Sequence, residues 1–154
     1  MSEISKFPNP VLHGRDIENM DEFTFDHPLN ANAERHTKSI SDAVGMKNIG
    51  VHLVCVEPGK ETTAFHFHHA EEEYIYILEG KGLLELGDDE VEVGAGSFIG
   101  FTAPSLPHAM RNASDQDLVY LMGGERRESD VCDYPRLKKR LYRVGEKSDL
   151  VDID

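Results

Sequence analysis

The sequence contains few cysteines, and their placement limits the role that sulfur chemistry can have. Only Cys55 and Cys132 occur, and no Cys-x-x-Cys pair is present. A disulfide framework is therefore not indicated, and two distant thiols are typical of a protein kept in a reducing compartment. Cys55 lies in the apolar run 49–56 and is predicted to be a small core residue. Cys132 is predicted to be a partly exposed free thiol, without a motif that would make it catalytic.

Basic residues are scarce as well. Sixteen Lys and Arg stand against 29 Asp and Glu, which gives a formal net charge of −13. A field of this sign repels polyanions, so we expect no nucleic-acid partner and no anionic-membrane partner. The one basic run, residues 136–143, is interpreted as a short edge strand or helix whose charges face solvent or the acidic body.

Long apolar stretches and a cationic-then-apolar leader are also lacking. Neither a membrane-spanning segment nor a secretory signal is therefore predicted, and we expect a soluble, cytoplasmic protein. A chain of 154 residues is long enough to bury a real core, and one domain is the simplest expectation.

The pattern along the chain changes at Ile49. Residues 1–48 carry Pro8, Pro10 and Pro28 and few sustained apolar periods, so they predict an irregular arm with short pieces at 11–20 and 39–44. From Ile49 onward, short β-rich runs recur at intervals of about 8 to 12 residues and are separated by Gly, Pro and Asp turns, which is typical of an all-β sandwich or barrel. The expected strands are 49–56, 62–68, 73–78, 83–86, 91–93, 97–101, 108–111 and 117–122. Residues 123–154 form a C-terminal extension that ends in an acidic frayed tail at 146–154.

The stretch 59–80 contains a histidine pair whose spacing favours a shared ligand. His66 and His68 lie two positions apart in a run that alternates as a strand does. Because successive side chains of an extended chain point to opposite faces, both imidazoles lie on one face and can converge on one ion. Glu73 offers a carboxylate at the start of the next strand. His-x-His followed by Glu on a strand pair is a metal-site arrangement.

Neighbouring residues compete for these roles. His69 falls on the opposite face from the pair and is left out, whereas Glu71 and Glu72 stay open as alternative carboxylates because a turn can change the phase of a strand. His52, in the first strand, is expected in the pocket or at its rim and not as a ligand. Three further histidines are expected at the surface, because none has a partner at strand or helix spacing; they are His13, His27 and His36.

These motifs resemble those of the cupin superfamily of small double-stranded β-helix barrels. The first cupin motif is matched with one departure, since six residues instead of five precede the first histidine, and the end of the second motif is matched while its Pro-x-Gly turn is replaced by residues 103–107. The matching positions are Gly59, His66, His68, Glu73, Gly80, His108 and Asn112. The resemblance implies a jelly-roll-like barrel over 49–122, flanked by the arm 1–48 and the extension 123–154. It also implies a homodimer, with the arm before Ile49 and the stretch after Tyr134 as candidates for strand exchange.

The resemblance further implies a metal site made of His66, His68, Glu73 and His108. Imidazoles and one carboxylate suit a divalent Fe, Mn, Ni, Co or Zn ion, and four protein ligands leave up to two positions of an octahedron open, as a catalytic site requires. Met110 shares the parity of His108 and is expected in the pocket wall, whereas Arg111 is expected to point away.

Three functional hypotheses follow. The first is a metal-dependent enzyme that acts on a small oxygen-rich metabolite, either by isomerisation of a sugar or sugar phosphate or by dioxygenase-type chemistry. A sugar phosphate would need a cation near the metal, and within 49–122 only Lys60, Lys81 and Arg111 are available, none of them clearly inward. The second hypothesis is a non-catalytic barrel that binds or senses a metal or metabolite. The third is a metal-free structural barrel.

Overall fold

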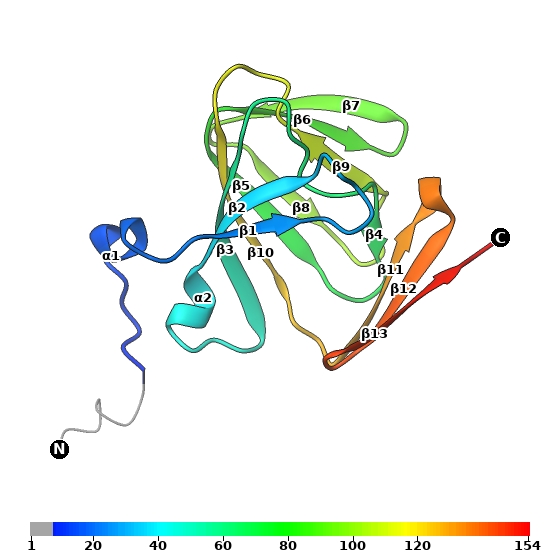
Figure 1. Ribbon diagram of the computed structural model, residues 1–154, viewed down its shortest axis with the longest axis horizontal. Coiled ribbons are helices and arrows are strands. Elements are labelled where there is room, and N and C mark those ends of the chain that lie inside the picture. Colours follow the sequence, from blue (N-terminus) through cyan, green and yellow to red (C-terminus); the bar gives the residue numbers. More distant parts are fainter. Residues whose placement is uncertain (1–7) are drawn as a thin grey trace.

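The structure is a computed structural model that describes residues 8–154 (Figure 1). Thirteen strands dominate it, together with two short helices, α1 (Gly14–Glu18) and α2 (Ile40–Ala43), and a 3-10 turn at Pro135–Leu137. The all-β prediction is confirmed, and the described part of the chain has no helix between residues 49 and 122. No helix in the described region has the length and apolar character needed to span a membrane.

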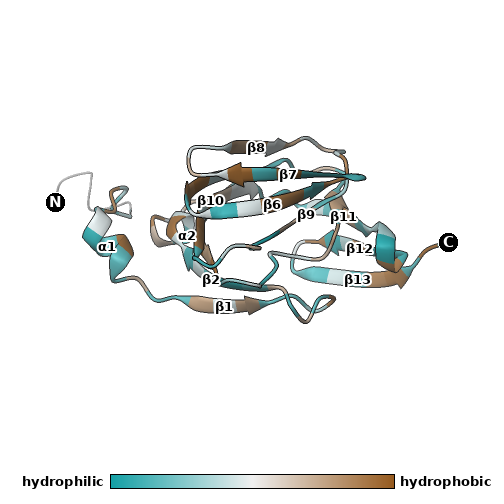
Figure 2. Cartoon of the chain, turned by 90° about the horizontal axis from the view of Figure 1, so that it is seen from above, coloured by the Kyte–Doolittle hydropathy of each residue, from teal (hydrophilic) through white to brown (hydrophobic). Residues whose placement is uncertain are grey.

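The largest sheet has six strands in the order β1-β2-β3-β10-β5-β8. It consists of β1 (Phe23–Asp26), β2 (Glu34–Ser39), β3 (Ile49–Val56), β10 (Leu118–Glu125), β5 (Glu73–Glu79) and β8 (Phe98–Phe101). Figure 2 shows its two edge strands, β8 and β1, on opposite sides of the molecule, so the sheet is strongly curved. The arm predicted as irregular therefore contributes two strands to this sheet, because β2 pairs with β3 from His36 to Ser39.

A second sheet has the order β7-β6-β9 and consists of β7 (Asp89–Gly94), β6 (Lys81–Leu86) and β9 (His108–Arg111). Apolar side chains of both sheets form one buried cluster; it comprises Val54, Val56, Ile75, Ile77, Leu84, Val93, Phe101, Met110, Leu118 and Tyr120. Removal of this apolar surface from water is the main force that closes the two sheets on one another. Gly80, between β5 and β6, has φ +80° and its Cβ would lie 2.3 Å from the Asp117 carbonyl oxygen, so only glycine fits this turn.

The third sheet has the order β13-β12-β11-β4 and contains three strands of the C-terminal extension. It consists of β4 (Phe67–His68), β11 (Ser129–Tyr134), β12 (Lys139–Val144) and β13 (Lys147–Asp152). The predicted frayed tail is wrong, because β13 pairs with β12 along its whole length. The strand expected at 62–68 is reduced to β4, with single bridges before it at Glu61 and His66.

The basic run lies mainly in β12, which is an interior strand and not an edge. Its charges face acidic side chains, as predicted, and the ion pairs join Arg136 to Glu85, Lys139 to Asp152, Arg140 to Asp133 and Arg143 to Glu71. Arg111 also points away from the core, to Glu85 and Glu90, as predicted. The two cysteine predictions are wrong: Cys132 is buried inside β11, whereas Cys55 is only partly buried.

Candidate metal centre

A backbone bridge brings together two histidines that lie far apart in the sequence. His66 and His108 exchange two hydrogen bonds: the His66 N–H donates to the His108 carbonyl at 3.1 Å, and the His108 N–H donates to the His66 carbonyl at 2.9 Å. Residues paired in this way point their side chains to the same face. The two imidazole centroids are consequently 4.8 Å apart, so the second motif histidine lies beside the first.

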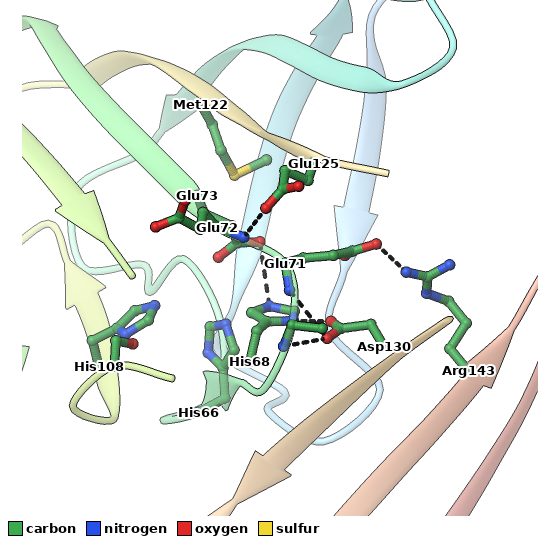
Figure 3. Close-up of polar contacts among 12 residues, drawn as sticks. His66, His68, Glu71, Glu72, Glu73, His108, Met122, Glu125, Asp130 and Arg143 are labelled. Carbon is green, nitrogen blue, oxygen red and sulfur yellow. Dashed lines mark hydrogen bonds and ion pairs between the residues drawn. The ribbon is translucent and has the colours of Figure 1, made fainter. Parts of the chain in front are cut away.

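His68 and Glu73 complete a cluster that Figure 3 shows around one point. The His66 and His68 rings are 5.1 Å apart, so the predicted shared face of this pair is confirmed. His68 Nε2 lies 3.2 Å from Glu73 Oε1. One ligand atom each from His66, Glu73 and His108 lies within 4.8 Å of the others. All four predicted residues are therefore neighbours in space.

Each of the three imidazoles is oriented through its Nδ1 atom. His66 Nδ1 lies 2.8 Å from the Ala64 carbonyl, and His108 Nδ1 lies 3.0 Å from the Leu106 carbonyl. His68 Nδ1 lies 2.6 Å from the Asp130 carboxylate. Because each of these acceptors requires a hydrogen on Nδ1, the neutral tautomer leaves the lone pair on Nε2. Metal-binding histidines are held by partners of this kind, which fix the ring and its tautomer.

The Asp130 carboxylate was not found by sequence reasoning. It accepts hydrogen bonds from the backbone N–H groups of Ala70 and Glu71 in addition to the one from His68 Nδ1, and its side chain is almost fully buried. Asp130, Cys132 and Tyr134 lie at every second position of β11 and therefore share a face. The Tyr134 ring lies 6.1 Å from that of His66. Only the alternation of this strand in the sequence could have indicated their common face, and the polar character of 125–133 concealed the strand.

Burial and neighbouring charges separate the pKa values of the cluster. Burial, reinforced by His108 and His68, lowers the pKa of His66 to about 3. Burial also lowers the pKa of His108. His68 differs: burial opposes its charged form, but hydrogen bonds and charges from Asp130 and Glu73 outweigh burial and raise its pKa to about 10. Burial would raise the pKa of Glu73, yet His68 and its neighbours lower it overall. The cluster thus favours an anionic carboxylate and one added positive charge.

The cluster opens onto a cavity of about 240 Å³, room for about eight water molecules at roughly 30 Å³ each. Apolar side chains make much of its wall, including Met110, as predicted, and Phe101, whose ring stacks on His108 with centroids 3.5 Å apart. His27, predicted at the surface, instead lines this cavity, and burial lowers its pKa. His52 is not among the residues that line it.

Other potential ligands are less well suited to a metal. Glu71 is engaged by Arg143 and by the Arg127 N–H, and Glu72 is exposed. His69 points to Asp133, 3.1 Å away, which agrees with its predicted opposite face. Cys132 lies near His66 and His68, but burial raises the pKa of its thiol to about 12, so the thiolate is disfavoured.

A model of the cupin domain matches residues 52–124. The chain is also 42% identical to a protein of Acidithiobacillus ferrooxidans that is provisionally assigned as a sugar phosphate isomerase, with a TM-score of 0.90 over 92% of this chain and 91% of that one. The chain belongs to the cupin superfamily. The predicted double-stranded β-helix is thereby confirmed.

Two further proteins are similar to this chain. A cupin-superfamily sugar phosphate isomerase from Silicibacter pomeroyi shares the fold, with a TM-score of 0.81, 24% identity and coverage of 93% of this chain and 92% of that one. An uncharacterised protein of Methanocaldococcus jannaschii is 34% identical over 80 residues. That match spans 52% of this chain and only 56% of the relative, so the chain covers little more than half of that protein.

Proposed function

We propose that this cupin holds one divalent transition-metal ion, of Fe, Mn, Ni, Co or Zn, and acts on a small oxygen-rich metabolite. The ligands would be the Nε2 atoms of His66, His68 and His108 and the carboxylate of Glu73. One observation carries the proposal: three imidazoles oriented through Nδ1 and one carboxylate converge beside a cavity with space for a guest. The charges agree, because Glu73 and Asp130 raise the pKa of His68 and so favour a positive charge at this position.

When bound, such an ion supplies Lewis acidity toward a chelating oxygen of the substrate. The chain's own residues would prepare the site for this chemistry. Asp130 and the carbonyls of Ala64 and Leu106 hold the imidazoles in one tautomer. Phe101 and Met110 make the cavity wall near the proposed metal ligands apolar. An apolar wall strengthens electrostatic interactions because it excludes water.

Isomerisation of a sugar or sugar phosphate is the first reaction to test. The protein of Acidithiobacillus ferrooxidans that shares 42% identity over nearly its whole length carries that provisional assignment. Dioxygenase-type chemistry with iron is the other reaction open to the same ligand set.

A non-catalytic barrel that binds or senses a metabolite is the second candidate function. Among the described residues that line the cavity, Glu73 is the sole carboxylate. Once Glu73 is a metal ligand, no second cavity carboxylate is present to serve as a general base in the way that many isomerisations require.

Removal of the metal decides between these functions. We expect purified protein to convert sugar phosphates, and a chelator to lower the rate at least about 100-fold, because Lewis-acid stabilisation of several kcal/mol corresponds to two or more factors of ten. Addition of the metal found by elemental analysis should restore the rate. Unchanged turnover after complete removal of the metal would contradict the proposal. Metal-loaded protein that turns over neither sugar phosphates nor, with oxygen uptake as the readout, hydroxylated metabolites would support the binding module.

We also propose that the chain forms a homodimer. The outer face of β5 and β8 exposes an apolar patch: Phe98 is 66% exposed, and it lies opposite Tyr76 in the strand pair and stacks on Tyr74. The flanking segments predicted to exchange both pair within their own chain, and the edge strands of the three sheets in the described residues are β1, β8, β13, β4, β7 and β9. The exposed apolar patch is therefore the better candidate for the contact.

Light scattering at micromolar concentration is expected to give the mass of two chains, and Phe98→Glu is expected to give the mass of one, because a charge buried without a partner opposes association. Val144→Glu is the matched control, since Val144 is 60% exposed and lies in β12, away from the patch. A wild-type protein with the mass of one chain, or equal effects of both substitutions, would contradict the dimer.

A further inference from the structure

Arg35 is a cavity residue whose charge has no counterion. It comes from β2, in the segment that sequence reasoning treated as an arm, and lines the same cavity as the histidine cluster. No carboxylate of residues 8–154 lies within ion-pair distance of its guanidinium, and its Nε is buried without a hydrogen-bond partner among those residues. Its Nη1 atom lies 3.6 Å from Met122 Sδ, and its guanidinium carbon lies 4.3 Å from the centroid of the Phe25 ring. In a chain with 29 acidic residues, this is an unusual position for a cation.

Four arginines outside the cavity behave differently. Arg111 and Arg136 pair with Glu85, Arg140 pairs with Asp133, and Arg143 pairs with Glu71. The fold thus supplies partners for guanidinium groups at the surface. Arg35 differs from these four arginines because it lines the cavity and has no carboxylate partner there among the described residues.

Tyr120 places a second unused donor in the same cavity. Its hydroxyl is buried without a hydrogen-bond partner in the described part of the chain, and its side chain lines the cavity. Tyr120 on β10 and Thr37 on β2 both pair with Val54 of β3. Because Arg35 has the parity of Thr37, the strand alternation places Arg35 and Tyr120 on the same inner face of the sheet. Burial raises the pKa of Tyr120 to about 12, so its hydroxyl keeps its hydrogen at neutral pH.

We propose that Arg35 and Tyr120 form an anion-binding subsite for the phosphate or carboxylate group of the substrate. Both unpaired atoms carry hydrogen, and a deprotonated acid offers only acceptors, so the two chemistries are complementary. A guanidinium has the planar donor geometry that binds such groups in a bidentate manner. This inference deepens the proposed function, because it assigns the substrate an anionic group in addition to the oxygen atoms that a metal would bind.

The test measures binding of inorganic phosphate and of acetate to the full chain as purified, after its metal content has been determined. Calorimetric titration is compared for wild type, Arg35→Gln, Arg35→Lys and Tyr120→Phe. We expect Arg35→Gln to weaken binding of the favoured anion at least about tenfold, since a charge-assisted, bidentate contact is lost. Arg35→Lys is expected to bind the anion with an affinity between those of wild type and Arg35→Gln. Tyr120→Phe is expected to weaken binding less than Arg35→Gln does. Arg111→Gln is the matched control, because it removes one guanidinium that is already paired at the surface.

The two anions and the metal analysis separate the outcomes. Stronger binding of phosphate assigns a phosphate ester, and stronger binding of acetate assigns a carboxylate. Equal affinity of wild type and Arg35→Gln, no binding of either anion to wild type, or an equal loss in Arg111→Gln would overturn the subsite. Circular dichroism of Arg35→Gln and Arg35→Lys shows whether a loss reflects misfolding. A large loss in folded Arg35→Gln, together with an intermediate loss in folded Arg35→Lys, supports the subsite. If anion binding depends on Arg35 while the protein holds no metal, the proposed function fails and this inference stands.

Discussion

Protein purified without chelators or a histidine tag is expected to contain about one divalent transition-metal ion per chain, as a mononuclear His/Glu site holds, and His66→Ala is expected to lose most of that metal. Glu73→Gln should have a similar effect with almost no change in shape. Elemental analysis of both variants beside wild type is the measurement.

The physical reason is the closeness of the four side chains. His66, Glu73 and His108 each offer a ligand atom within 4.8 Å of the others, and His68 Nε2 is 3.2 Å from Glu73. Removing one ligand leaves a buried site with fewer donors than the ion needs. Loss of an outer hydrogen-bond partner alone costs about 10- to 100-fold in metal affinity, so loss of a direct ligand should cost more.

His69→Ala is the matched control, because it removes an adjacent imidazole that contacts Asp133 and not the cluster. This variant should keep its metal. Circular dichroism must show that His66→Ala and Glu73→Gln are folded. Full metal occupancy in both folded variants would show that the ligands lie elsewhere, and metal loss in His69→Ala to the same extent would show that the assay reports general damage.

The strands of the barrel were predictable because their signals are local. Alternation, β-branched residues and Gly or Pro turns act within a few positions, and most of the strands expected between Ile49 and Met122 occur near their predicted places. The shared face of His66 and His68 follows from two-residue periodicity alone. The turn at Gly80 is equally local, since its positive φ is a property of one residue.

Features that depend on contacts between distant segments were not predictable in this way. β2 and β13 are polar strands stabilised by their neighbours in the sheets, so their own sequences resemble an arm and a tail. Asp130 reaches His68 only because β11 pairs with β4. Arg35 was missed for the same reason: it lies outside the range 49–122 expected to form the barrel, and the pairing of β2 with β3 brings it to the cavity.

Asp130→Asn is expected to weaken metal binding about 10- to 100-fold, as loss of an outer partner of a metal-bound histidine does. The Asp130 carboxylate is the acceptor that holds His68 Nδ1, at 2.6 Å. An asparagine side chain has similar size but no charge, and it can turn an N–H₂ group toward the imidazole. Competition with a chromogenic chelator gives the affinities of the variant and wild type.

The same substitution should change how the stability of the metal-free protein depends on pH. In the folded chain the pKa of His68 is raised from 6.5 to about 10, so the stability it contributes is present in full below pH 6.5 and is lost as the pH rises toward about 10. The pKa of Asp130 is lowered from 3.8 to about 2, despite burial, by His68 and two backbone N–H groups. Its contribution is present above pH 3.8 and is lost as the pH falls toward about 2.

Urea unfolding of chelator-treated protein at pH 6.5 and at pH 10 is therefore expected to show a larger fall in the free energy of unfolding for wild type than for Asp130→Asn. Asp152→Asn is the control, because it removes the same charge from an exposed ion pair with Lys139, and exposed pairs contribute little. Equal falls in all three proteins would mean that Asp130 does not raise the pKa of His68. A metal affinity of Asp130→Asn equal to that of wild type would mean that the His68–Asp130 contact does not support the metal site.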